Sequence, residues 1–261
     1  MEIMKGGEPH SFKTNSEVGI LLIHGFTGTT SGMRSLMNHF IDCNYNIECP
    51  RLTGHGTKKE DLIAVKYHEW LADVERSFML LKERAKKIFV IGLSMGGALA
   101  LHLASKYSEI MGIVVINNAL VYNFSMDIQF KLIPLLKIFV KNVKGVASDI
   151  KDPDEKEIAY DSIPINGVAQ FYRLLNYVKK ELKNVTVPTL IFKSKEDHVI
   201  PIISAKYTFS KINSLQKEII WLNNSYHVAT MDFDKSIIIK KSADFISSLC
   251  LSCEGRREDM P

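Results

Sequence analysis

The sequence predicts an α/β protein with one mostly parallel β-sheet that is covered by helices on both faces. Strand patterns alternate with helix patterns through most of the 261 residues, and this alternation favours parallel pairing. The strand patterns are continuous apolar runs, as expected for strands that are buried on both faces. One of them, residues 88–91, is followed by a glycine-flanked serine and then by a helix pattern.

The first half of the chain supplies four of the expected strands, at residues 18–23, 45–49, 88–91 and 112–116. All four are apolar runs, and the second ends at Pro50, which has no backbone N–H for a sheet. Helices are expected between them at residues 31–43, 67–84 and 97–104. In the helix 67–84 the apolar residues recur three or four positions apart and form one core-facing stripe. These residues are Trp70, Leu71, Val74, Phe78 and Leu81.

The alternation resumes near the C-terminus. Strands are expected at residues 189–193 and 217–222, and helices at residues 202–212 and 235–249. The chain end, residues 253–261, is polar, and we expect it to be frayed.

Residues 120–185 interrupt the alternation with two helix patterns and a charged break at residues 151–157. The segment lies between two core strands and contains no strand–helix repeat. We therefore predict a helical cap, or lid, inserted over the carboxyl edge of the sheet, with residues 1–119 and 186–261 forming the core domain. Two additional core helices are the alternative interpretation.

The composition indicates a soluble globular protein, with 46% hydrophobic and 24% charged residues. The 33 basic and 29 acidic residues leave a net charge of +4 without a dominant basic block, so no nucleic-acid partner is expected. No apolar run approaches the roughly 20 residues that span a bilayer, and no signal-peptide core is visible, so we expect a cytoplasmic protein without stable membrane insertion. Nothing in the sequence decides between a monomer and a homodimer.

Four cysteines are present, and Cys250 and Cys253 form a C-x-x-C pattern near the chain end. A second cysteine pair or a nearby histidine would be needed to complete a zinc site, and neither is found. We therefore expect no metal.

The stretch Gly92-Leu93-Ser94-Met95-Gly96 fits the G-x-S-x-G nucleophile elbow, a sharp strand-to-helix turn that exposes a serine hydroxyl. Glycines on either side lack a Cβ, so the strand and the helix can approach closely around the serine. This context predicts that Ser94 is a nucleophile.

A serine hydroxyl is a weak nucleophile, so it needs a base and a third group that orients the base. On this type of scaffold the chain order is serine, acid, histidine. His227 lies between the last strand and the last helix, at the edge where ligand-binding groups gather in parallel sheets. Glu196 and Asp197 both follow the strand 189–193 and are both candidates for the acid, and the shorter side chain favours Asp197.

The tetrahedral intermediate of acyl transfer carries an oxyanion that requires preorganised donors. One donor is expected from the backbone amide of Met95, the residue after the nucleophile. The second is expected from the loop after the first strand, where Gly25 lets the chain turn and Phe26 presents its amide.

Four further polar residues are predicted to have structural roles. His24 is expected to bond to backbone, and His55 to tether a glycine-rich turn. Asp232 and Asp234 are expected in the first turn of the last helix, where a negative charge complements the helix dipole.

The chain resembles the bacterial carboxylesterases and monoacylglycerol lipases of the α/β-hydrolase superfamily. The resemblance is carried by HGFTG at residues 24–28, PRLTGHG at residues 50–56 and GLSMGG at residues 92–97, together with the contexts of Asp197 and His227. All of these occur in the family's order, and the similarity extends from about residue 18 to residue 249.

The resemblance implies the α/β-hydrolase fold and a cofactor-free hydrolysis of short- to medium-chain carboxylic esters, monoacylglycerols among them, through an acyl-enzyme. By motif position it implies Ser94 as nucleophile, Asp197 as acid and His227 as base, with Phe26 and Met95 supplying the oxyanion amides. The lysine-rich cap departs from the family pattern, so the acyl-chain preference is not carried over.

The apolar residues of the predicted cap are candidates for an acyl pocket, and packing against the sheet domain is the alternative role. We select Phe124, Met126, Phe130 and Leu136 as substrate-contacting residues. With Lys131, Lys137 and Lys141 interleaved, the same stretch is also a candidate contact for anionic lipid.

Two other classes of function remain open at this point. Another serine hydrolase, such as a thioesterase, a peptidase or a carbon–carbon bond hydrolase, would use the same triad. A non-catalytic binding protein would keep only the fold. The complete set of Ser94, Asp197 and His227 favours an enzyme.

Overall fold

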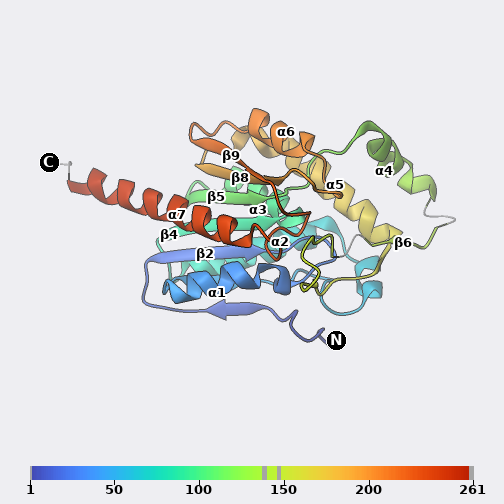
Figure 1. Ribbon diagram of the computed structural model, residues 1–261, viewed down its shortest axis with the longest axis horizontal. Helices are drawn as coiled ribbons and strands as arrows, with labels where there is room; N and C mark the ends of the chain where they lie inside the picture. The colour runs from blue at the N-terminus through green and yellow to red at the C-terminus, as the bar shows by residue number, and fades with distance from the viewer. Residues whose placement is uncertain (1, 137–139, 146–147, 259–261) are drawn as a thin grey trace.

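Seven strands form the central sheet, in the order β1-β3-β2-β4-β5-β8-β9 (Figure 1). Every neighbouring pair is parallel except β1 and β3, so the predicted mostly parallel sheet is confirmed. The computed structural model describes residues 2–136, 140–145 and 148–258, and their side chains except those of 134–136 and 252–258. The strands are β1 His10–Phe12, β2 Val18–Ile23, β3 Asn46–Cys49, β4 Lys87–Leu93, β5 Ile110–Ile116, β8 Thr189–Ser194 and β9 Lys217–Leu222.

Helices cover both faces of this sheet, with α1 and α7 on one face and α2, α3 and α6 on the other. Strand β4 shows how one apolar run serves two cores. Ile88 and Val90 join the cluster of α2 and α3, whereas Phe89 and Ile91 join the cluster of α1 and α7, because successive side chains of a strand point to opposite faces. The helices are α1 Arg34–Asp42, α2 Tyr67–Lys82, α3 Met95–Lys106, α6 Ile203–Lys211 and α7 Lys235–Glu258.

The stripe predicted along α2 is buried along its whole length and faces the sheet. Trp70 is fully buried, and its Nε1 donates a hydrogen bond to the Thr53 carbonyl at 2.9 Å. At the other end of the helix, Leu81 occupies the space that a side chain on Gly19 of β2 would need. The apolar periodicity therefore fixed the face of α2 that packs on the sheet.

Between β5 and β8 the chain forms α4 Phe124–Leu136, β6 Asn142–Lys144, β7 Ser162–Pro164 and α5 Ile165–Glu181. The two strands form a small antiparallel sheet of their own. The two helices differ in their packing. Phe171, Leu174 and Val178 of α5 join the main core, whereas Phe124, Ile128 and Leu132 of α4 are exposed. The division of the chain into a core and a cap stays a prediction, and α5 has the packing of a core helix.

None of the helices within the described ranges is both long and apolar enough to cross a membrane.

Two details of the chain differ from the sequence-based expectations. Strands β1, β6 and β7 were not predicted, because each has three residues and is too short to show a period. Helix α7 continues to Glu258, so the frayed end predicted from residue 253 is wrong up to that point, and residues 259–261 lie outside the described part. Extending an established helix costs little, because each added residue gains a hydrogen bond.

Two adjacent leucines at the end of α2 allow a matched test of the core. Leu81 is fully buried, whereas Leu80 is 44% exposed. We expect Leu81→Ala to lower the free energy of unfolding by about 2–5 kcal/mol, since it removes packed methyl groups and leaves a cavity. Leu80→Ala should change it by less than about 1 kcal/mol. Urea denaturation followed by circular dichroism measures both, and equal effects would contradict the packing described for α2.

Candidate active site

Ser94 lies in the turn between β4 and α3, with φ 55° and ψ −113°. A positive φ is costly for a residue with a side chain, by about 1–3 kcal/mol, and such strain is characteristic of functional sites. The flanking glycines are required here. A Cβ on Gly92 would overlap the Gly96 carbonyl oxygen, and a Cβ on Gly96 would overlap the carbonyl oxygen of Ile23. The sequence motif therefore has the tight strand-to-helix geometry that it predicts.

The neighbouring strand β5 holds the strained turn in place. The Ser94 amide donates a hydrogen bond to the Ile116 carbonyl at 2.8 Å, and the Ser94 carbonyl accepts one from Ala119 N at 3.2 Å. The first turn of α3 adds a bond from Gly97 N to the same carbonyl at 3.0 Å. The backbone polar groups of Ser94 are thus satisfied, and its hydroxyl faces a cavity.

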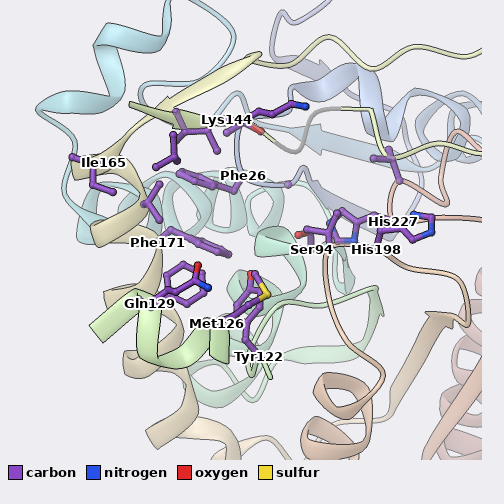
Figure 2. Close-up of a pocket in the computed structure, with 18 of the residues that line it drawn as sticks. Phe26, Ser94, Tyr122, Met126, Gln129, Lys144, Ile165, Phe171, His198 and His227 are labelled. Carbon is purple, nitrogen blue, oxygen red and sulfur yellow. The ribbon is translucent and has the colours of Figure 1, made fainter. Parts of the chain in front are cut away.

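His227 follows β9, and its Nδ1 lies 3.0 and 3.1 Å from the two carboxylate oxygens of Asp197, which follows β8. A carboxylate accepts hydrogen bonds, so Nδ1 carries the proton and Nε2 is left as a proton acceptor. The structure brings Ser94 and His227 to the same end of one cavity (Figure 2). The serine, histidine and carboxylate predicted from the sequence are therefore neighbours in space.

Asp197 is fixed from several sides. Its Oδ1 accepts hydrogen bonds from the amides of Val199 at 2.9 Å and Ile200 at 2.8 Å, and its Oδ2 contacts the ammonium of Lys193. Burial raises the pKa of this carboxyl, but attraction to His227 and Lys193 and the hydrogen bonds outweigh burial and hold the pKa well below its usual range. Asp197 is therefore a carboxylate throughout the neutral pH range.

The alternative acid, Glu196, is exposed and pairs with Lys151 at 3.0 Å rather than with His227. This contact favours Asp197 as the carboxylate that orients the histidine.

Two backbone amides near Ser94 are free to donate. No described residue accepts a hydrogen bond from the amide of Phe26 or of Met95. Phe26 and Ser94 line the same cavity, and a Cβ on Gly25 would lie 3.3 Å from the Ser94 Cβ, which places the Phe26 loop directly against the serine. Neither amide predicted for the oxyanion has a partner among the described residues, and both belong to chain segments that adjoin Ser94.

The cavity has a volume of about 370 Å³, within the range of small-molecule sites. Met126 and Phe130 line it, as expected for substrate-contacting residues. Phe124 does not, because its side chain is 82% exposed to solvent on another face of α4, so its selection is corrected. The side chain of Leu136 and residue Lys137 lie outside the described part of the structure. Other apolar lining residues come from the insertion: Ile133, Val143, Ile163, Ile165, Val168 and Phe171.

Glu157 is a site residue that the sequence analysis did not find. It lines the cavity, is buried, and packs its Oε1 where a side chain on Gly28 would lie. The backbone amide of Ser148 donates a hydrogen bond to its carboxyl group. Burial raises its pKa to about 7, and attraction to His227 partly opposes the rise. Its position in a run of charged residues gave no sign that it would be buried.

The two structural histidines behave as expected. His24 Nδ1 bonds to the Gly25 carbonyl at 2.8 Å, and its Nε2 accepts from Leu52 N at 3.1 Å. His55 is buried and bonds to the Thr53 carbonyl at 3.1 Å. Burial lowers the pKa of His24 to about 4 and that of His55 to about 3, so both rings are neutral.

The expectation for Asp232 and Asp234 is wrong, because both precede α7. Asp232 is buried and accepts the amides of Lys151 at 2.8 Å and Tyr226 at 2.8 Å. It thereby joins the insertion to the loop of His227. Asp234 accepts the amide of Asn224 at 2.8 Å.

The fold and the arrangement of the site are those of a hydrolase with the α/β-hydrolase fold, and the relatives identify the class as carboxylic ester hydrolases. Comparison with known proteins supports this class. The chain belongs to the Hydrolase_4 family, described as serine aminopeptidase, S33, whose profile matches residues 14–234.

Curated relatives match nearly the whole chain. It is 41% identical to a thermostable monoacylglycerol lipase of Bacillus sp. (strain H-257), over 94% of this chain and 96% of the relative. It is 26% identical to a carboxylesterase of Bacillus subtilis (strain 168), over 93% and 97%.

Solved structures agree with this family. One comes from work on LipS and LipT, two metagenome-derived lipolytic enzymes. It superposes with a TM-score of 0.90 at 36% identity, over 95% of this chain and 100% of that chain. A monoacylglycerol lipase of Paleococcus ferrophilus shares the fold, with a TM-score of 0.78 at 17% identity, over 95% and 100%.

The buried carboxyl group of Glu157 predicts a pH dependence of stability. Its pKa is higher in the folded state, about 7 against an ordinary 4.5, so the folded state binds more protons between these values and stability falls as pH rises through them. Glu157→Gln removes this effect. Relative to wild type, its free energy of unfolding should increase by on the order of 1–3 kcal/mol between about pH 4.5 and pH 8. Thermal melts at several pH values measure it, and a constant difference would contradict the burial of a titrating carboxyl group.

Proposed function

We propose that Ser94, His227 and Asp197 act as nucleophile, general base and orienting acid in a two-step hydrolysis of carboxylic esters. The observation that carries the proposal is the contact of His227 Nδ1 with the buried Asp197 carboxylate, in a cavity where the ring lies beside the strained Ser94. A histidine held in this tautomer accepts a proton through Nε2, which is the role required for serine activation.

In the first step, His227 takes the hydroxyl proton of Ser94 while the oxygen attacks the ester carbonyl carbon. The resulting oxyanion accepts hydrogen bonds from the amides of Phe26 and Met95, and each such donor contributes about a hundred- to a thousandfold in turnover. His227 then passes the proton to the leaving alcohol, and an acyl group stays on Ser94. In the second step, water repeats the sequence and releases the acid.

We propose esters with short or medium acyl chains as substrates, monoacylglycerols among them. The apolar side chains of Met126, Phe130 and Phe171 line the cavity and suit an acyl chain. The position of Glu157 is suited to binding the alcohol portion of the ester. Its carboxyl group is close enough to His227 to be attracted by it, and the leaving alcohol must lie next to His227 to receive the proton. One hydrogen bond from the Ser148 amide leaves further acceptor positions on this carboxyl group, so it can also accept hydrogen bonds from the free hydroxyls of a glycerol group.

The monoacylglycerol lipase relative supports this substrate class over thioesters or carbon–carbon bonds. The strained Ser94 turn and the free amides around it favour catalysis over passive binding. A cytoplasmic location and the absence of a nucleic-acid partner, both inferred from the composition, stay predictions.

Removing the nucleophile tests the proposed chemistry. Ser94→Ala should lower kcat/KM for p-nitrophenyl esters of graded chain length by about 10⁴-fold or more, because neither acyl transfer nor base catalysis through the hydroxyl remains. The same variant should lose labelling by a fluorophosphonate probe. Ester hydrolysis that survives this substitution would refute the assignment of Ser94.

The two adjacent carboxylates provide a matched pair for the acid. Asp197→Asn should lower kcat by about 10⁴-fold, because an amide in place of the carboxylate favours the wrong histidine tautomer. Glu196→Gln, one residue earlier and exposed, should leave kcat unchanged. The opposite pattern would assign the acid to Glu196.

The proposed role of Glu157 is tested by changing the alcohol portion of the substrate at constant acyl chain. Glu157→Ala should lower kcat/KM for a monoacylglycerol by about ten- to a hundredfold relative to the methyl ester of the same acid, because hydrogen bonds to the glycerol hydroxyls are lost. Equal losses of kcat/KM on the two esters would refute glycerol recognition by Glu157 without contradicting ester hydrolysis.

A further inference from the structure

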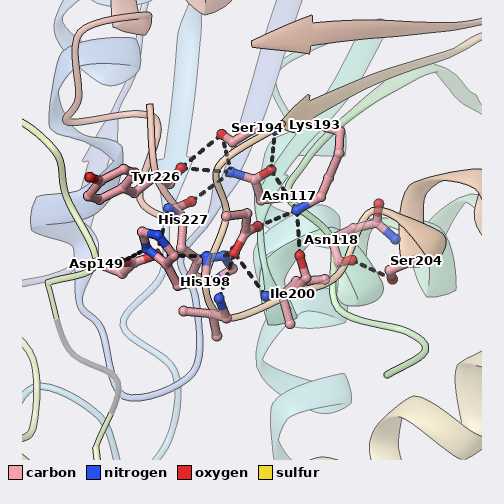
Figure 3. Close-up of polar contacts among 12 residues, drawn as sticks. Asn117, Asn118, Asp149, Lys193, Ser194, His198, Ile200, Ser204, Tyr226 and His227 are labelled. Atoms are coloured by element: carbon pink, nitrogen blue, oxygen red, sulfur yellow. Dashed lines mark hydrogen bonds and ion pairs between the residues drawn. The ribbon is translucent and has the colours of Figure 1, made fainter. Parts of the chain in front are cut away.

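A lysine lies buried behind the carboxylate of Asp197. Lys193 belongs to β8, and its side chain has no exposed surface. Its ammonium contacts Asp197 Oδ2 and donates hydrogen bonds to the Ile200 carbonyl at 2.7 Å and to Asn117 Oδ1 at 3.3 Å (Figure 3). A lysine ammonium has three donors, and here each one has an acceptor. This environment fits the charged form of Lys193.

Lys193 and Asp197 form an ion pair within the protein interior, since the Asp197 side chain is only 1% exposed. Burial lowers the pKa of Lys193, and the charge of Asp197 opposes that effect. Charges in such surroundings are weakly screened by solvent, so each one strongly affects the protonation of its neighbours. The ammonium therefore acts on any group that shares Asp197 with it.

His227 is the group that shares Asp197. An aspartate alone stabilises the positively charged imidazolium, which cannot accept a proton from a serine. A cation on the second side of the same carboxylate offsets this stabilisation. Two other carboxylates face His227 from the insertion. Glu157 lines the same cavity and is attracted by His227. Asp149 accepts the His227 amide at 3.1 Å and is paired with His198 at 2.8 Å.

On the side of the acid, the hydroxyl of Tyr122 is neutral, because burial and the nearby charge of Asp197 raise its pKa far above the physiological range. In the described structure, two side chains thus contact the Asp197 carboxylate with their nitrogens: the Lys193 ammonium, which is the cation, and the His227 ring.

We propose that Lys193 is a positioning residue that clamps Asp197 and offsets its charge, so that His227 stays neutral and able to accept the serine proton at mildly acidic pH. The inference rests on the proposed triad of Ser94, His227 and Asp197. Asn117 completes the clamp. Its Oδ1 also accepts Ser194 N at 2.8 Å, and its Nδ2 donates to the His227 carbonyl at 2.8 Å, so one side chain joins the strand of the lysine to the loop of the base.

Two substitutions separate charge from hydrogen bonding. Lys193→Met removes both, and Lys193→Gln removes the charge but keeps a donor near Asp197. We expect the acidic limb of the kcat/KM–pH profile on a short-chain p-nitrophenyl ester to move to higher pH by about one unit in both variants. The ratio of variant to wild-type kcat/KM would then be about tenfold smaller on the acidic limb than on the plateau. Part of the plateau kcat lost in the Met variant should return in the Gln variant.

Lys195→Met is the matched control, because it removes one positive charge two residues further along, from an exposed side chain. Its acidic limb should coincide with that of wild type. Lys193 variants that fold, react with a fluorophosphonate probe and keep the wild-type acidic limb would overturn the proposal. Retained activity in Ser94→Ala would instead overturn the proposed triad, so the two failures are distinguishable.

A measurement on the unmodified protein covers the case in which neither variant folds. With ¹⁵N-labelled lysine, the Lys193 ammonium signal should persist across the pH range of the acidic limb. Loss of its proton within that range would overturn the proposal, because a neutral amine cannot offset the charge of Asp197.

Discussion

The site depends on one strained residue that the sheet holds in place. Ser94 adopts a left-handed backbone conformation between β4 and α3, and nothing in its own side chain favours that conformation. The strain persists because β4 lies between two parallel strands and residues 95–104 of α3 are buried against the sheet. The hydrogen bond from Ser94 N to the Ile116 carbonyl continues the pairing of β4 with β5 to the serine itself. The stability of the core is therefore what presents the hydroxyl to the cavity.

A parallel sheet also explains how distant residues meet. Phe26, Ser94, Asp197 and His227 follow β2, β4, β8 and β9, whose carboxyl ends lie along one edge of the sheet. Alignment of strands alone would leave these loops free to shift against each other. Asn117, after β5, prevents this through hydrogen bonds to β8 and to the loop of His227. The positions of His227 and Asp197 are consequently coupled through buried polar contacts as well as through the sheet.

What the sequence predicted and what it missed have a common physical reason. Ser94 and His227 were found because a local pattern, a turn motif or a place after a strand, reports their position. The sequence favoured Asp197 over Glu196 through its shorter side chain and through the position that the resemblance implies. Which carboxylate turns inward is seen only in the structure, because adjacent acidic residues share one local pattern. Glu157 stands in a charged run that reads as solvent-exposed, and its burial results from packing against glycines distant in sequence.

Helix α4 shows the same limit for apolar residues. Its sequence is apolar on every side, so no periodicity distinguishes the face towards the cavity from the face towards solvent. Residues three or four positions apart share a face of the helix, but which face lines the cavity is known only once the helix is placed. Met126, Phe130 and Ile133 line the cavity, whereas Phe124, Ile128 and Leu132 are exposed. The error at Phe124 follows from this.

The insertion is attached to the reacting groups as well as covering them. Phe171 of α5 stacks on Phe26 with ring centroids 4.8 Å apart, so α5 supports the loop whose amide is proposed for the oxyanion. On the opposite side, Asp149 accepts the amide of His227, and Asp232 accepts the amide of Lys151. A change in residues 120–185 therefore reaches both the Phe26 loop and His227 through direct contacts. The lining of the cavity and the position of His227 are for this reason parts of one packed structure.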